Sequence, residues 1–192
     1  HEHPSKPAIV YNGTSISYAA FSHAIGATRR YLETLEFPAG HTVVVMIDRL
    51  RDCWVAVLGL ESLGLNTVCV GSVAVLETLQ LNNISGIVTT EIEVPKHQLE
   101  PDTRAGHKII AIPNPSFGSD ELLPVPAVKE NAKNGGHILY TSGTTGRYKK
   151  LLWAGDLQLR RDAERIASDD YNADTVYHCA NLGLWTSAGY KI

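Results

Sequence analysis

The chain has 192 residues, of which 44% are hydrophobic, 19% charged and 7% aromatic. This is the composition of a globular protein with one good-sized core, and it excludes the disordered and fibrous classes. Because the formal net charge is -3, no overall positive potential attracts the protein to nucleic acid or anionic lipid. No apolar run approaches the ~18 residues that span a bilayer.

The first residues predict a β-hairpin followed by a helix. Two short β-favouring runs flank Asn12-Gly13, a pair that accepts the positive φ angles of a type I′ turn. Apolar residues then recur at helical spacing as far as Leu35, with Ser17 available as the N-cap. We therefore expect an amphipathic helix of about five turns.

The next segments alternate between strands and helices. Residues 42–47, 66–70 and 87–90 are short apolar or β-branched runs, typical of parallel strands that are covered on both faces. Residues 52–63 and 73–81 have helical spacing, and Gly86 is the expected break before the third strand. The alternation predicts an α/β fold with a mainly parallel sheet flanked by helices, in addition to the N-terminal β-hairpin.

Residues 91–135 form a Pro-rich connecting region, in which six prolines break the periodicity and residues 108–112 are a candidate strand. Residues 136–140 are a further strand candidate, and residues 157–167 predict a helix. Three widely spaced cysteines, Cys53, Cys69 and Cys179, predict reduced, buried thiols and a cytoplasmic protein. The histidine spacing predicts no metal site.

The loop after Tyr140 has the composition of a phosphate cradle. Thr141-Ser-Gly-Thr-Thr-Gly146 supplies hydroxyl donors and glycines that let backbone N–H groups turn toward an anion, and Lys149 adds charge. It matches neither the Walker A pattern nor the G-x-G-x-x-G fingerprint. By composition alone, a plain turn remains open as the alternative.

The order of residues in Tyr140-Thr-Ser-Gly-Thr-Thr-Gly-x-x-Lys149 closely resembles the signature loop of the adenylate-forming, or AMP-binding, enzymes. This superfamily comprises acyl- and aryl-CoA ligases, nonribosomal-peptide adenylation domains and luciferases. Residues 3–18 and 43–70 are also similar to the family's opening hairpin and its strand, helix and strand. The resemblance implies that residues 1–192 are a partial N-terminal adenylation domain.

The resemblance also implies a reaction. ATP and a small carboxylic acid would give an acyl-adenylate and pyrophosphate, normally followed by transfer to the thiol of coenzyme A or of a carrier protein, as in an acid-thiol ligase. ATP and Mg²⁺ would be the cofactors. The implied ligands of the β- and γ-phosphates are Thr141, Ser142, Gly143, Thr144, Thr145 and Gly146, and Lys149 would pair with the outer phosphates.

Three features depart from the family pattern. Tyr148 stands where proline is usual and Lys150 where glycine is usual, which predicts a less rigid loop and weaker binding. The family's downstream motif is missing from residues 181–189, where Trp185 is a candidate for the acyl pocket, although a buried core position is the favoured interpretation.

The third departure is length, because the family's adenine, ribose and catalytic-lysine positions lie later in a longer chain. We expect a fragment that is inactive without the remainder of its parent chain. The alternative is a naturally short, noncatalytic protein that binds nucleotide or assembles with a partner.

Overall fold

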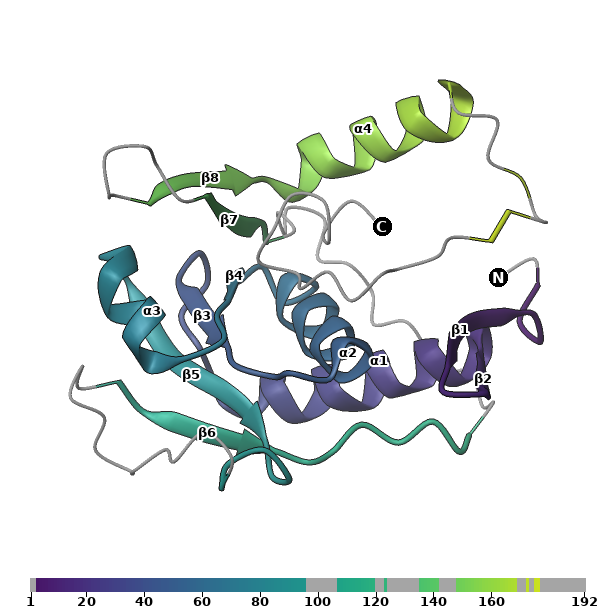
Figure 1. Ribbon diagram of the computed structural model, residues 1–192, viewed down its shortest axis with the longest axis horizontal. Coiled ribbons are helices and arrows are strands. Elements are labelled where there is room, and N and C mark those ends of the chain that lie inside the picture. The colour runs from purple at the N-terminus through teal and green to yellow at the C-terminus, as the bar shows by residue number, and fades with distance from the viewer. Residues whose placement is uncertain are drawn as a thin grey trace.

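The computed structural model describes residues 3–95, 107–119, 123, 135–141, 148–168, 172 and 175–176. Within these residues, a six-stranded sheet has helices on both faces, and a two-stranded N-terminal hairpin packs against the first helix, apart from the sheet (Figure 1). The sheet is parallel except at one edge. The predicted α/β class, with its mainly parallel sheet and N-terminal hairpin, is confirmed.

The N-terminal hairpin pairs β1 (Pro7–Tyr11) with β2 (Thr14–Ser17) in antiparallel register. Its turn lies at Asn12 and Gly13, whose φ angles are 49° and 75°. Positive φ at both central residues is what a type I′ turn requires. The turn predicted from the Asn-Gly pair is therefore confirmed.

Helix α1 (Tyr18–Glu33) follows the hairpin directly. The backbone N–H of Ala20 donates a hydrogen bond of 3.0 Å to Ser17 Oγ, so Ser17 is the N-cap that the sequence predicted. The buried side of the helix includes Ala24 and Leu32, and it packs against the next helix, α2 (Leu50–Glu61).

The central sheet has the strand order β6-β5-β3-β4-β7-β8. Neighbouring strands from β6 to β7 are parallel, and β8 pairs with β7 in antiparallel direction at the edge. The strands are β3 (Thr42–Val45), β4 (Asn66–Cys69), β5 (Ile84–Thr90), β6 (Ile109–Ile112), β7 (His137–Thr141) and β8 (Lys149–Trp153).

Helices α1 and α2 cover one face of the sheet, and α3 (Val73–Leu79) covers the other (Figure 1). Side chains alternate along a strand, so Val43 and Val45 join the core under α1 and α2, while Val44 and Met46 join the core under α3. Because β3 is buried on both faces, its sequence is a continuous apolar run.

One predicted boundary was wrong. Gly86 lies inside β5, which begins at Ile84, and does not interrupt the chain before the strand. A Cβ atom there would lie 3.2 Å from the carbonyl oxygen of Lys108, so close packing beside β6 accounts for the glycine. The chain instead changes direction between α3 and β5 at Gln80 and Asn83, whose φ angles are 46° and 56°.

The sequence analysis did not anticipate β8. Its residues, Lys-Lys-Leu-Leu-Trp, lack the alternation of a half-buried strand, and the conformation depends on pairing with β7. Helix α4 (Gly155–Ser168) follows β8 and confirms the helix predicted over residues 157–167. In the connecting region, β6 confirms the strand expected at residues 108–112.

Two of the three cysteines lie in the part of the chain that the structure describes. Cys53 and Cys69 are buried free thiols, as predicted, with their Sγ atoms 3.5 Å apart. Burial raises the pKa of the Cys69 thiol well above its ordinary value. Cys179 lies outside the described residues. No helix in the described ranges is long and apolar enough to span a membrane.

Candidate functional site

The predicted phosphate-binding residues divide into two groups. Thr141 is the last residue of β7 and Lys149 is the first residue of β8, and both are exposed. Ser142, Gly143, Thr144, Thr145 and Gly146, which connect them, lie outside the described residues, as does Trp185. The structure therefore describes the two stems of the loop.

The two stems meet across the β7–β8 ladder, where Thr141 and Lys149 are direct partners in the antiparallel register. Directly opposed residues have side chains on the same face of a sheet, with Cβ atoms about 5 Å apart. A hydroxyl and an ammonium group are thus presented side by side at the point where the chain enters and leaves the loop.

This point lies at the carboxyl edge of the sheet. β7 is parallel to β4, so its last residue, Thr141, is at the same edge as the carboxyl ends of β3, β4 and β5. Open α/β sheets bind ligands outside the carboxyl ends of their strands. The position of Thr141 therefore fits a binding role.

Two hollows lined by described residues lie away from the loop stems. One, of about 350 Å³, opens at the amino ends of β5 and β6 and includes His41, Ser85 and Lys108. The other, of about 150 Å³, lies between α1 and residues 112–116. Neither is lined by Thr141 or Lys149, which are both exposed.

The two loop residues that depart from the family pattern, Tyr148 and Lys150, have packing partners. The rings of Tyr148 and Tyr140 meet edge to face, with centroids 5.5 Å apart and an interplanar angle of 88°. Lys150 Nζ donates hydrogen bonds to the carbonyl oxygens of Leu79, at 2.7 Å, and Gln80, at 3.0 Å. Both side chains hold the first residues of β8 against neighbouring elements.

Tyr140 lies in the core beneath α3 and is 9% exposed. Burial raises its pKa to about 12, with smaller contributions from Cys69 and Tyr148. Tyr140 is therefore neutral at physiological pH. Its position one residue before Thr141 makes it a packed support for the loop stem, and the phenol does not supply charge there.

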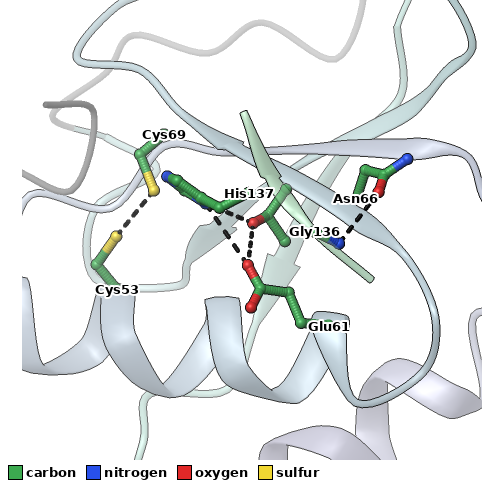
Figure 2. Close-up of polar contacts among 7 residues, drawn as sticks. Cys53, Glu61, Asn66, Cys69, Gly136 and His137 are labelled. Atoms are coloured by element: carbon green, nitrogen blue, oxygen red, sulfur yellow. Dashed lines mark hydrogen bonds and ion pairs between the residues drawn. The ribbon is translucent and has the colours of Figure 1, made fainter. Parts of the chain in front are cut away.

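The other end of β7 is held by a buried polar cluster (Figure 2). Thr67 Oγ1 donates to Glu61 Oε1 at 2.7 Å and lies 2.7 Å from His137 Nδ1, which is 3.6 Å from the same Glu61 oxygen. Because the hydroxyl has one hydrogen, it accepts its second bond from Nδ1–H. The cluster joins α2, β4 and β7 through side chains that are 10% exposed or less.

Backbone contacts reinforce this end of the strand. The N–H of Gly136 donates to Asn66 Oδ1 at 3.1 Å (Figure 2). The carbonyl of Gly136 accepts from the N–H of Thr67 at 2.8 Å. A Cβ at residue 135 would collide with the carbonyl of Leu65, and one at residue 136 would lie 2.7 Å from the carbonyl oxygen of Trp153. The Gly135-Gly136 pair is therefore required by close approach.

Sequence reasoning missed the cluster of Glu61, Thr67 and His137. The available signal was the Gly-Gly-His order directly before a strand, which indicates close backbone approach next to a buried polar residue. The partners of His137 lie 70 and 76 positions earlier in the chain, and nothing local identifies them.

A second set of buried charges lies where β3 and β5 end. Glu93 is 4% exposed, and its carboxylate accepts hydrogen bonds from the N–H groups of Asp48, at 2.7 Å, and Arg49, at 3.3 Å. Burial raises the pKa of Asp52, although Arg51 and Arg49 beside it act in the opposite direction. These groups close the carboxyl ends of two central strands.

A protein-family model described as AMP-binding enzyme matches residues 1–153. The match includes both loop stems and extends to the last residue of β8. A search of curated proteins finds no match to this sequence.

Solved structures share the fold at low sequence identity. The O-succinylbenzoate coenzyme A synthetase MenE from Bacillus subtilis, in complex with AMP, is 18% identical with a TM-score of 0.71, covering 98% of this chain and 50% of its own. ATP-bound MatB from Rhodopseudomonas palustris is 19% identical with a TM-score of 0.72, covering 97% of this chain and 39% of its own.

The N-terminal subdomain of NpsA from Klebsiella oxytoca, in complex with 3-hydroxybenzoyl-AMSN, is also similar. It is 18% identical with a TM-score of 0.58, and the match covers 80% of this chain and 38% of that chain. At such identities the three structures show the fold alone. The chain spans half or less of the length of each of them.

Proposed function

The chain belongs to the AMP-binding enzyme family, and from this premise we propose that it is the N-terminal part of an ATP-dependent enzyme that activates carboxylic acids. The membership confirms the resemblance to adenylate-forming enzymes that the sequence predicted. The proposed reaction joins an acid to AMP with release of pyrophosphate, and then transfers the acyl group to a thiol.

One observation assigns the proposed function to particular residues. Thr141 and Lys149 are opposed in register at the exposed end of the β7–β8 hairpin, on either side of the loop whose sequence matches the family signature. A short hydroxyl and a lysine beside a glycine-rich turn suit polyphosphate, because they combine hydrogen-bond donors with a point charge. The exposed position admits a nucleotide without displacing the core.

The proposed chemistry assigns a task to these side chains. A carboxylate oxygen attacks the α-phosphorus of ATP and the bond to pyrophosphate breaks, so negative charge accumulates on the departing group. Lys149 would neutralise that charge and Thr141 would donate to a phosphate oxygen. Mg²⁺ would arrive with the nucleotide, whose phosphate oxygens commonly supply several of its ligands.

Other parts of the proposal rest on the sequence. Residues 142–146 would complete the phosphate contacts through backbone and hydroxyl donors, and Trp185 would line the acyl pocket. In the second step a thiol sulfur, from coenzyme A or a carrier protein, attacks the acyl carbon and AMP leaves. We propose residues 1–192 as a partial adenylation domain that contains the connecting region 91–135.

The test is ATP–pyrophosphate exchange with a panel of acids, in the longest natural protein that contains this sequence. We expect Lys149→Ala to lower the exchange rate by about 100-fold or more, the size of effect seen when a donor to developing charge is removed. Lys108→Ala removes an exposed charge near the opposite edge of the sheet and is the matched control.

A near-normal exchange rate in Lys149→Ala would contradict the role assigned to this lysine. Exchange that is absent with every acid, together with retained binding of ATP, would favour the noncatalytic alternative. The intact mass of the protein from its native source shows which chain the assay should use.

A further inference from the structure

Two adjacent lysines open β8, and they lie in different surroundings. Successive residues of a strand point to opposite faces, so Lys149 and Lys150 cannot serve the same contact. Lys150 is the register partner of Tyr140, whose ring lies in the core beneath α3. Lys149 is the partner of Thr141 and shares a face with Leu139, which belongs to the core beneath α1 and α2.

Lys150 reaches the carboxyl end of α3. That helix ends at Leu79, and the chain leaves it through Gln80 in the left-handed conformation. The last carbonyl groups of a helix have no intrahelical donor and carry the negative end of its dipole. The ammonium of Lys150 donates to the carbonyl oxygen of Leu79, at 2.7 Å, and to that of the C-cap residue Gln80, at 3.0 Å, and so caps a helix that lies about 70 positions earlier.

Tyr148, two residues before Lys150, makes a second contact with the core beneath α3 on the same face of the sheet. Its ring packs edge to face on Tyr140 and against the core beneath α3. Among the residues that the structure describes, β8 is the edge strand and pairs with β7 alone. Tyr148 and Lys150 flank Lys149 in sequence, and their contacts lie on the opposite face of the strand. These contacts therefore limit how far Lys149 can rotate or shift away from Thr141.

The geometry points to Lys150, supported by Tyr148, as a positioning residue that anchors β8 to α3 and thereby holds Lys149 opposite Thr141. This inference rests on the proposed function to the extent that Lys149 meets a polyphosphate. It also gives a role to the two loop residues that depart from the family pattern, because anchoring by the side chains of Tyr148 and Lys150 replaces the backbone stiffness that a proline would supply. Lys150 itself does not touch the ligand.

The first experiment measures binding of inorganic tripolyphosphate to the 192-residue chain by calorimetry. We expect Lys149→Met to weaken binding by about tenfold, and Lys150→Met by about fivefold, because the second change acts only through position. Lys150→Arg, which still donates to carbonyl groups, should restore the affinity to within about twofold. Lys108→Met is the control for loss of one positive charge.

The second experiment needs no ligand. Amide hydrogen exchange compares wild type, Lys150→Met and Lys149→Met, with the amides of β3 as the internal reference for global stability. We expect the amides of β8 to exchange about tenfold faster in Lys150→Met and to be unchanged in Lys149→Met. Equal exchange in all three proteins would overturn the anchoring role, whatever the ligand results.

The outcomes separate the inference from the proposed function. If Lys149→Met weakens tripolyphosphate binding and Lys150→Met does not, the positioning role of Lys150 is wrong and the phosphate-binding role of Lys149 is supported. If Lys150→Met loses as much as Lys149→Met and arginine does not restore it, Lys150 contacts the anion directly and the inference is wrong. If the wild-type chain does not bind tripolyphosphate, the phosphate role of this region is in doubt, and hydrogen exchange still decides the anchoring.

Discussion

The two ends of the β7–β8 hairpin differ in burial and in what holds them. At the inner end, His137 is 0% exposed and lies among Thr67, Glu61 and the backbone of β4. At the outer end, Thr141 and Lys149 are exposed, and β8 is tied to α3 through the long side chain of Lys150. One element therefore joins a fully packed base to a solvent-facing tip.

The difference shows how an exposed loop can be placed accurately. Functional groups are positioned best when rigid elements and a supporting shell hold them. Here the support is the buried polar cluster around His137, about four residues before Thr141 in β7. The exposed tip remains free to accept a ligand. Changes at the base should therefore affect stability, and changes at the tip should affect binding.

The largest effect is expected at Gly135. A methyl group there collides with the carbonyl of Leu65, so Gly135→Ala must displace β7 from β4. We expect the free energy of unfolding to fall by about 4 kcal/mol or more, as measured by chemical denaturation. Gly71→Ala is the control, since a Cβ at residue 71 meets nothing within 4 Å. Equal stability of the two variants would contradict the tight approach.

A smaller loss is expected in the polar cluster. Thr67→Val keeps the shape of the side chain but removes the hydroxyl between Glu61 and His137, which should cost about 2 kcal/mol of unfolding free energy. The same substitution at Thr89 is the matched control. Thr89 is 0% exposed, and its hydroxyl has no hydrogen-bond partner among the described residues, so Thr89→Val should be neutral or stabilising. Similar losses in both variants would break the argument for the cluster.

Tyr140 lies between the two ends of the hairpin, and its raised pKa predicts that the free energy of unfolding depends on pH. Its pKa is raised from 10 to about 12, so the folded state keeps its proton while the unfolded state loses it. The stabilising contribution is complete below pH 10 and is lost as the pH rises toward 12. At pH 11 the loss should be about 1 kcal/mol in wild type relative to Tyr140→Phe. Parallel stability curves for the two proteins from pH 9 to 11.5 would refute it.

The smallest effect on stability is expected at the tip. Lys149→Met changes an exposed residue of an edge strand, so the free energy of unfolding should change by less than about 0.5 kcal/mol. The same variant is expected to bind tripolyphosphate about tenfold more weakly. A destabilisation comparable to that of Thr67→Val would mean that the tip also stabilises the fold. The two ends of the hairpin would then not differ in their contribution to stability.

Local sequence determined the elements whose cause is local. The Asn12-Gly13 turn, the Ser17 cap and the apolar run of β3 each depend on neighbouring residues, and each was predicted. The family resemblance likewise depended on the order of residues 140–149, which a motif preserves without reference to the fold.

Tertiary structure decided the rest. β8 exists because β7 offers it a ladder, Gly86 belongs to a strand because β6 approaches it, and Lys150 caps a helix that ended 71 residues earlier. His137 finds Thr67 only when β7 lies beside β4. The physical reason is range: turns and caps are satisfied within a few residues, whereas buried polar groups and edge strands take whatever partners the sheet order brings to them.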